Sequence, residues 1–275
     1  MPPPRLRKQA STALRPMPSP PRLVVVDINE LLPDAIKTRT MLQQLAASPA
    51  QVVLATSSGL EMSRRFLHRC GQSFPMIIAD GAGLLAADGS TLASSRVLPA
   101  ELVSGMWSVA DALDEPLLFT FETTEGDVVQ RTTNQDKPMD LPSSIFRIRI
   151  EGEEAPRVLF EANIREKFWK QRCIALHVAG DGSLEIIHPL ADRGIAVQDV
   201  ARRLGTPRET VMAVVSSERS AGLAEWSGFA VALSDAPATI QDLADVTTEA
   251  AAEDGLAEAL HTWILAPDPQ TTEPA

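Results

Sequence analysis

The strongest constraint in this sequence is a pattern that begins, stops and later returns. Strand-length apolar runs, the first at residues 23–28, alternate with amphipathic helical segments as far as residue 79. The same alternation resumes after residue 191 and continues to residue 264. Continuous apolar strands separated by helices are typical of a parallel sheet that is covered on both faces. We therefore expect an α/β, doubly wound parallel-sheet core built from two separate stretches of chain, residues 23–86 and 189–266.

The block between these stretches, residues 87–188, follows a different pattern. Its strands alternate apolar and polar residues, and hairpin turn signals stand at residues 88–89 and 180–182. One amphipathic helix is predicted from apolar side chains spaced at i, i+4, i+7 and i+11, namely Leu102, Met106, Val109 and Leu113. These features predict an inserted α+β cap domain that is covered on one face only.

The two ends of the chain do not carry either pattern. Seven of the first 22 residues are proline, which removes backbone donors and fixes φ, and this stretch contains arginine but no acid. We expect residues 1–22 to form a disordered Pro/Arg-rich leader and residues 267–275 a disordered tail.

Composition limits the possible partners and the compartment. The net charge of −11 argues against a nucleic-acid groove and against binding to an anionic membrane. No apolar stretch reaches the roughly 18 residues that a membrane span needs. Cys70 and Cys173 lack metal-type spacing and are expected to be reduced thiols of a cytoplasmic protein. The four tryptophans, Trp107, Trp169, Trp226 and Trp263, are expected to be packing residues.

Six short sequence motifs occur in the order and at the spacing of a known family. They are VVVDINELL (24–32), LATSSG (54–59), ADGAG (79–83), DRG (192–194), VMAVVSSERSAGLAEWSGFAVAL (211–233) and VTTEAAAEDGLAEAL (246–260). Together they resemble the Cof-type branch of the haloacid dehalogenase (HAD) superfamily of phosphatases over about residues 23–264. The resemblance implies a HAD-like core, a cap and, for an active member, Mg²⁺-dependent hydrolysis of small phosphorylated metabolites such as sugar phosphates.

The resemblance also implies which residues would carry the chemistry. Asp27 occupies the position of the nucleophile, and Asn29 that of the acid/base, where an amide has no proton to shuttle. Thr56 and Arg193 occupy the phosphate-binding positions. The metal positions fall on Asp27, the backbone of Asn29, and two serines that replace aspartates, Ser216 and Ser220. Because serine is a weak ligand and Mg²⁺ requires hard oxygen ligands, we expect no metal cofactor unless the chain is active.

These substitutions leave several interpretations open. Thr56 and Arg193 could bind a phosphate, or Arg193 could pair with Asp27 in a closed cleft. Glu30 and Glu218 could rebuild a metal site from shifted positions. The chain is accordingly expected to be an inactive or severely impaired HAD-fold protein that binds a protein partner or a phosphorylated small molecule. The alternative is an active Mg²⁺-dependent phosphatase with Asp27 as nucleophile. The sequence does not define the oligomeric state.

Overall fold

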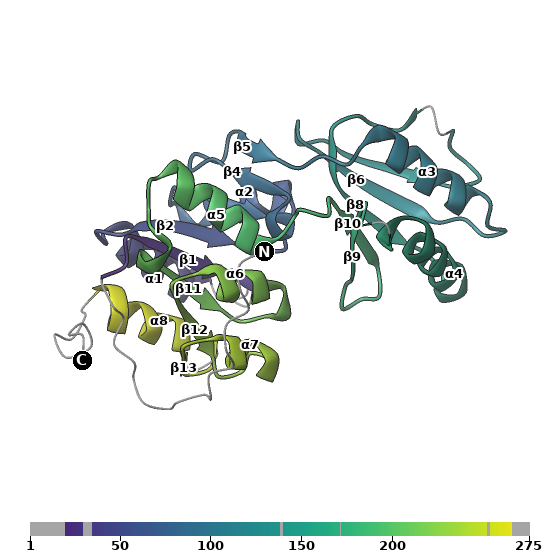
Figure 1. Cartoon of the computed structure of the whole chain (residues 1–275). Helices are drawn as coiled ribbons and strands as arrows, with labels where there is room; N and C mark the ends of the chain where they lie inside the picture. Colours follow the sequence, from purple (N-terminus) through teal and green to yellow (C-terminus); the bar gives the residue numbers. More distant parts are fainter. Residues whose placement is uncertain (1–19, 30–34, 138–139, 171, 252–253, 266–275) are drawn as a thin grey trace.

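The computed structural model describes residues 20–29, 35–137, 140–170, 172–251 and 254–265. They form an α/β core and an α+β insert, which lie on opposite sides of Figure 1. Most of the predicted leader and the predicted tail fall outside the described residues. The first described residues already contact the core, since the backbone N–H of Arg22 donates to the carbonyl of Thr210 at 2.9 Å.

The core is built on one eight-stranded sheet in the order β13-β12-β11-β1-β2-β3-β4-β5. The strands from β13 to β3 are parallel, while β4 and β5 are antiparallel. The α/β fold predicted from the sequence is therefore confirmed. The strands are β1 (Leu23–Asp27), β2 (Gln51–Ala55), β3 (Met76–Ile78), β4 (Gly83–Leu85), β5 (Leu92–Ser95), β11 (Val211–Val215), β12 (Phe229–Leu233) and β13 (Val246–Thr248).

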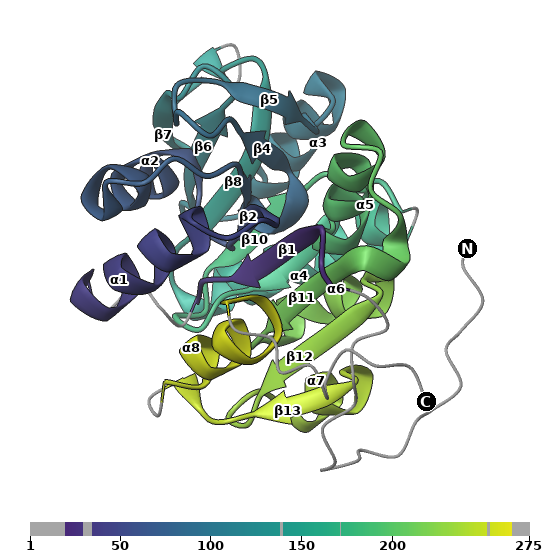
Figure 2. The same cartoon turned by 90° about the vertical axis from the view of Figure 1, so that its left-hand side faces the viewer.

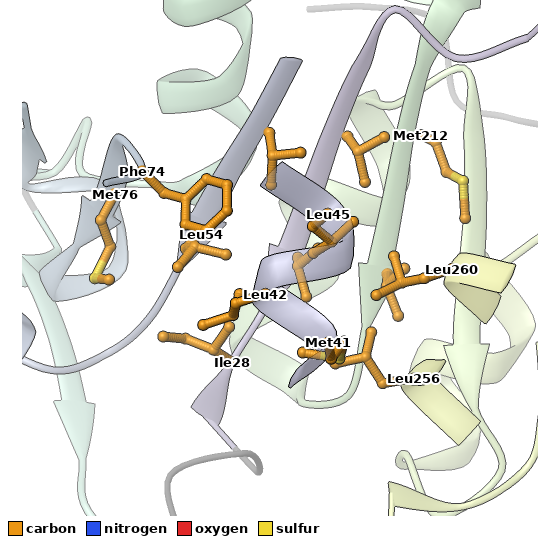
Figure 3. Packing of buried hydrophobic residues seen from close by; sticks show 14 of the residues in the cluster. Ile28, Met41, Leu42, Leu45, Leu54, Phe74, Met76, Met212, Leu256 and Leu260 are labelled. Carbon is orange, nitrogen blue, oxygen red and sulfur yellow. The ribbon is translucent and has the colours of Figure 1, made fainter. Parts of the chain in front are cut away.

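Helices cover both faces of this sheet, because alternate residues of a strand point to opposite sides. On β1, Val24 and Val26 belong to the apolar cluster that α1, α2 and α8 complete, and part of that cluster is drawn in Figure 3. Leu23 and Val25 belong to the opposite cluster, completed by α5, α6 and α7. The helices are α1 (Ala35–Ala46), α2 (Leu60–Cys70), α5 (Arg193–Arg203), α6 (Ala221–Trp226), α7 (Ala238–Leu243) and α8 (Gly255–Leu260).

The hairpin at residues 88–89 belongs to the core and not to the insert. β4 pairs with β3, and β5 pairs with β4, so the hairpin extends the core sheet by two antiparallel strands. Leu85 is fully buried in the core cluster. The predicted start of the insert at residue 87 therefore moves to the segment after β5. The turn signal located the hairpin correctly but carried no information on which sheet it would join.

The insert contains a five-stranded antiparallel sheet in the order β7-β6-β8-β10-β9. Two helices pack on it, and Figure 1 shows them on the side of this sheet that is remote from the core. Trp107 and Phe119 pack in its centre, with ring centroids 5.2 Å apart. The elements are α3 (Ala100–Asp111), β6 (Leu118–Thr123), β7 (Val128–Thr132), β8 (Ile145–Glu151), α4 (Glu154–Ile164), β9 (Ala175–Val178) and β10 (Leu184–Ile187).

Candidate functional site

Asp27 lies at the carboxyl end of β1, near the middle of the core sheet (Figure 2). In open α/β sheets, ligands bind outside the carboxyl ends of the strands. The neighbouring strands end at the same edge, which places Thr56 after β2 and Ser216 after β11. Parallel register alone thus brings these three side chains, far apart in sequence, to one place.

The carboxylate of Asp27 is neutralised by donors from the protein itself. Its Oδ2 lies 3.0 Å from Nη1 of Arg193, and neither side chain is exposed. Its Oδ1 accepts a hydrogen bond from the backbone N–H of Asn29 at 3.2 Å. Three hydroxyls also donate to Oδ2, those of Ser216 (3.2 Å), Ser217 (3.1 Å) and Ser220. Oδ2 is therefore surrounded by donors from the protein, while Oδ1 accepts one backbone hydrogen bond.

The side chain of Asn29 bonds to Thr56, which the resemblance assigns to phosphate binding. Its Oδ1 accepts from the hydroxyl of Thr56 at 3.0 Å, from the backbone N–H of Ser57 at 2.9 Å and from the hydroxyl of Ser57 at 3.2 Å. Because the backbone N–H of Ser57 can only donate, the atom it meets is the amide oxygen. The hydroxyl of Thr56, the predicted phosphate-binding group, is thus bonded to Asn29.

Arg193 is placed by the start of α5. The side chain of Asp192 caps this helix by accepting from the backbone N–H of Ile195 at 2.9 Å. Gly222 must be glycine here, because a Cβ at that position would lie 2.4 Å from the Asp192 carboxylate. This tight junction fixes the backbone of Arg193 and directs its guanidinium toward the carboxyl end of β1.

Asp80 is the second acid that holds Arg193. Its Oδ1 accepts from Nε and Nη2 of Arg193 at 3.1 and 2.8 Å, while its Oδ2 accepts from Nη1 of Arg219. Burial raises the pKa of Asp80, but the charges of Arg193 and Arg219 outweigh burial and hold that pKa below its ordinary value. Burial lowers the pKa of Arg193, and the charges of Asp27 and Asp80 reverse this and raise it. Asp80, Arg193 and Arg219 are therefore all ionised at neutral pH.

The ionic cluster continues from the core into the insert. Arg219 also donates to Glu185 of β10 at 2.7 Å. Arg147 of β8 donates to the carbonyl of Ser57, in the core, at 2.7 Å, and to Glu122 of β6 at 3.0 Å. Glu122 packs so closely on the core that a Cβ at Gly59 would lie 1.9 Å from its carboxylate. Side chains of the insert thus occupy the space above the sheet edge.

Mg²⁺ does not fit this set of residues. The ion requires near-octahedral oxygen ligands, yet Asp27 Oδ2 is surrounded by proton donors and Ser216 and Ser220 bring no charge. Across the part of the chain that the structure describes, no group of three or more His, Cys, Asp or Glu side chains is arranged to hold a metal. Glu218 is exposed, and Glu30 lies outside the described residues.

Fold and site together define a doubly wound α/β protein in which the acid at the end of the central strand β1 is paired with a buried arginine. The haloacid dehalogenase-like hydrolase family matches residues 34–260, and the chain belongs to that family. The predicted resemblance to its Cof-type branch is thereby confirmed. The match begins after Asp27 and Asn29, so it does not include the motif at residues 24–32 that contains the predicted nucleophile.

Individual relatives agree with this assignment. The 5-amino-6-(5-phospho-D-ribitylamino)uracil phosphatase YcsE of Bacillus subtilis is 20% identical over 251 residues, which covers 89% of this chain and 96% of that protein. A haloacid dehalogenase-like hydrolase from Bacteroides thetaiotaomicron has a similar structure, with a TM-score of 0.73, 18% identity, and coverage of 87% of this chain and 98% of that one. A haloacid dehalogenase-like hydrolase from B. subtilis gives a TM-score of 0.69 at 16% identity, and the match covers 88% of this chain and 98% of that one.

The structure brings the predicted site residues together, while their chemical roles stay predictions. One continuous network contains Asp27, Asn29, Thr56, Arg193, Ser216 and Ser220. The sequence analysis missed the acid that organises it, Asp80. The sequence did contain a signal. Asp80 of ADGAG stands where the motif of the resembled family reads Asn-Gly-Ala, and Arg219 stands where another motif of that family has an asparagine. When an acid and a base both replace uncharged residues of a family pattern, the two side chains are expected to form an ion pair.

Among the described residues, no helix is both long and apolar enough to pass through a lipid bilayer.

Proposed function

We propose that this chain is a non-catalytic member of the HAD family that acts by binding rather than by Mg²⁺-dependent hydrolysis. The observation that carries the proposal is the buried pair between Arg193 and Asp27, in which neither side chain reaches solvent. A nucleophile must present electron density to phosphorus, and here Oδ2 of Asp27 is engaged by a guanidinium and three hydroxyl groups, which lower the nucleophilicity of the carboxylate.

The acid/base position supports the same conclusion. General acid–base catalysis contributes roughly 10²–10⁴ in rate, and the amide of Asn29 cannot supply it. Phosphoryl transfer also depends on neutralising the negative charge that develops on the transferred group. The cationic groups near Asp27 are already paired with carboxylates, since Asp27 and Asp80 hold Arg193, and Asp80 and Glu185 hold Arg219.

The same geometry favours a protein partner over a phosphorylated small molecule. A phosphorylated small molecule would have to displace Asn29 from Thr56 and Ser57, and then compete with Asp27 and Asp80 for Arg193. A protein partner on the outer surface would meet none of these costs. We therefore favour a protein partner, and a cytoplasmic location stays a prediction.

An active phosphatase is the second candidate function. It is favoured by family membership, by the phosphatase name of the B. subtilis relative, and by the retention of Asp27 and Thr56. This function would require Arg193 to leave Asp27 and a metal to be held with far fewer carboxylates than the family pattern supplies.

Turnover separates the two candidates. The purified chain and Asp27→Asn are assayed on an aryl phosphate and on a panel of sugar phosphates, with Mg²⁺ and with EDTA. Equal inertness of both proteins is the expected result. Mg²⁺-dependent hydrolysis that disappears in Asp27→Asn would overturn the proposal.

A thermal-shift screen with phosphorylated metabolites then tests the ligand ranking. A ligand that binds the folded state raises the melting temperature progressively with concentration. We expect no such rise in the wild type, and a saturable rise that Arg193→Lys abolishes would establish a phosphorylated ligand instead.

A further inference from the structure

A pocket lies at the amino end of the core sheet, the end of the strands opposite to Asp27. Its volume is about 520 Å³, and it is bounded by the starts of β2 and β3, the end of β4 and the end of α5. Its walls are mostly apolar, with Leu45 and Phe74, both labelled in Figure 3, on one side of the sheet and Val200 of α5 on the other. Apolar walls and a volume of about 300–1,000 Å³ are typical of a site for a small molecule.

The pocket exists because β2 extends beyond its neighbour β3 at this end of the sheet. The two strands pair from Leu54 and Met76 onward, so the first residues of β2 face a gap on that side. The backbone N–H of Leu54 donates across to the carbonyl of Pro75 at 3.0 Å. Alternate residues of a parallel strand direct their backbone groups to the same neighbour, so the N–H of Val52 points into the gap. Among the residues that the structure describes, no backbone carbonyl accepts from this N–H.

Charge at the pocket identifies the kind of ligand that fits it. Arg203, the last residue of α5, is the one charged residue among those that line the pocket. Within the described part of the chain it has no acidic partner, whereas its neighbour Arg202 pairs with Asp199 at 2.8 Å. The planar fork of a guanidinium matches a carboxylate, and one cation balances one negative charge. A guanidinium and a backbone N–H that both lack acceptors therefore indicate an anionic acceptor group on an apolar ligand.

We propose that this pocket binds a small apolar carboxylate, such as a medium-chain fatty acid. The carboxylate accepts from Arg203, the N–H of Val52 is available as a further donor, and the hydrocarbon lies against the apolar walls. The segment before residue 20 does not match the pocket, because residues 5–15 carry four basic side chains and no acid, and like charges repel. Because the pocket and Asp27 lie at opposite ends of the strands, the inference does not depend on whether the Asp27 cluster is catalytic.

Isothermal titration calorimetry of the full chain with hexanoate, octanoate and octan-1-ol tests the proposal. Octanoate should bind saturably at one site, and hexanoate more weakly by up to about fourfold for each methylene removed, because less apolar surface is buried. Octan-1-ol has the same chain without the charge, so it should bind about fivefold or more weakly than octanoate. No saturable binding of either acid, or an alcohol that binds as tightly as octanoate, would overturn the proposal.

Two variants of the chain test the two parts of the pocket. Arg203→Gln should raise the dissociation constant of octanoate about fivefold or more and leave that of octan-1-ol within about twofold. Arg202→Gln is its matched control, since Arg202 is 73% exposed and does not line the pocket, and it should leave both constants within about twofold. Ala46→Trp places a large side chain at an exposed lining position and should abolish binding, whereas Ala47→Trp, one residue outside the lining, should preserve it.

Exposed apolar surface elsewhere on the chain is the competing binding site for an apolar acid. The largest exposed apolar side chain among the described residues is Trp169, which is 47% exposed instead of packed as expected from the sequence. Trp169→Ala should leave the dissociation constant of octanoate within about twofold. Thermal melting of each variant verifies that it folds. Octanoate binding that is unchanged in Arg203→Gln and Ala46→Trp, or that is lost in Trp169→Ala, would overturn the proposal.

Discussion

Replacing Asp80 with asparagine isolates the charge that holds the ionic cluster together. Asp80 adopts the left-handed region, with φ 54° and ψ 30°. Asparagine is among the residues that tolerate this region best, so the substitution changes charge and leaves the backbone preference intact. The variant retains an oxygen that can accept from Arg193, but it leaves two guanidinium groups with one negative partner fewer.

The expected cost follows from burial. The side chain of Arg193 is fully buried and that of Asp80 is 9% exposed. Removing one member of a buried pair costs about 3–5 kcal/mol when the remaining charge has no other partner. Arg193 keeps Asp27 and Arg219 keeps Glu185, so we expect the lower end of this range, about 3 kcal/mol. For a protein of this size that loss corresponds to a fall in melting temperature of roughly 6–12 °C. Asp242→Asn changes an exposed acid and should stay within about 0.5 kcal/mol of wild type.

Urea denaturation at neutral pH provides the free energies of unfolding for a double-mutant cycle. The second member is Arg219→Asn, which removes the charge that is paired with Asp80. The double variant should be less destabilised than the sum of the two single variants, by at least about 1 kcal/mol. Additive losses, or a loss below about 1 kcal/mol for Asp80→Asn alone, would refute the reasoning.

Three further results are expected. The pKa of Asp80 is lower in the folded state than its ordinary value of 3.8, so ionised Asp80 stabilises the fold at any pH above that value, and this stability is lost as the pH falls through the folded pKa. The urea midpoint of wild type should therefore fall more steeply below about pH 4 than that of Asp80→Asn. Parallel curves would contradict this. Gly81→Ala should cost about 2 kcal/mol or more in the same assay, because Gly81 has φ +99° and a Cβ would lie 2.4 Å from the carbonyl oxygen of Asp192; a stable variant would show that this contact is not rigid. Exchanging EDTA for millimolar Mg²⁺ should leave the melting temperature of wild type unchanged, and a concentration-dependent rise would reveal a metal site.

The sequence was sufficient to predict the core because its signals are local and repeated. The runs of β1, β2, β11 and β12 are almost entirely apolar, which only a sheet buried on both faces explains. The destination of the β4–β5 hairpin was not predictable in this way. Strand pairing depends on which edge is free in three dimensions, and a turn signal does not contain that information.

The sequence predicted most of the residues that form the candidate site, but only some of the contacts between them. The resemblance brought Asp27, Thr56 and Ser216 into one site, and the pair of Arg193 with Asp27 was one of the two alternatives left open for Arg193. The sequence did not indicate that Asn29 would turn its amide oxygen toward Thr56. Such a choice depends on side-chain torsions and on competing donors, which no spacing rule specifies.

A crystal structure of the chain grown in millimolar Mg²⁺ tests the central claim most directly. The account predicts that Asp27 Oδ2 still meets Nη1 of Arg193 and the three serine hydroxyls, with no cation between them. An octahedrally coordinated ion bound to Asp27, with the guanidinium of Arg193 withdrawn, would contradict it.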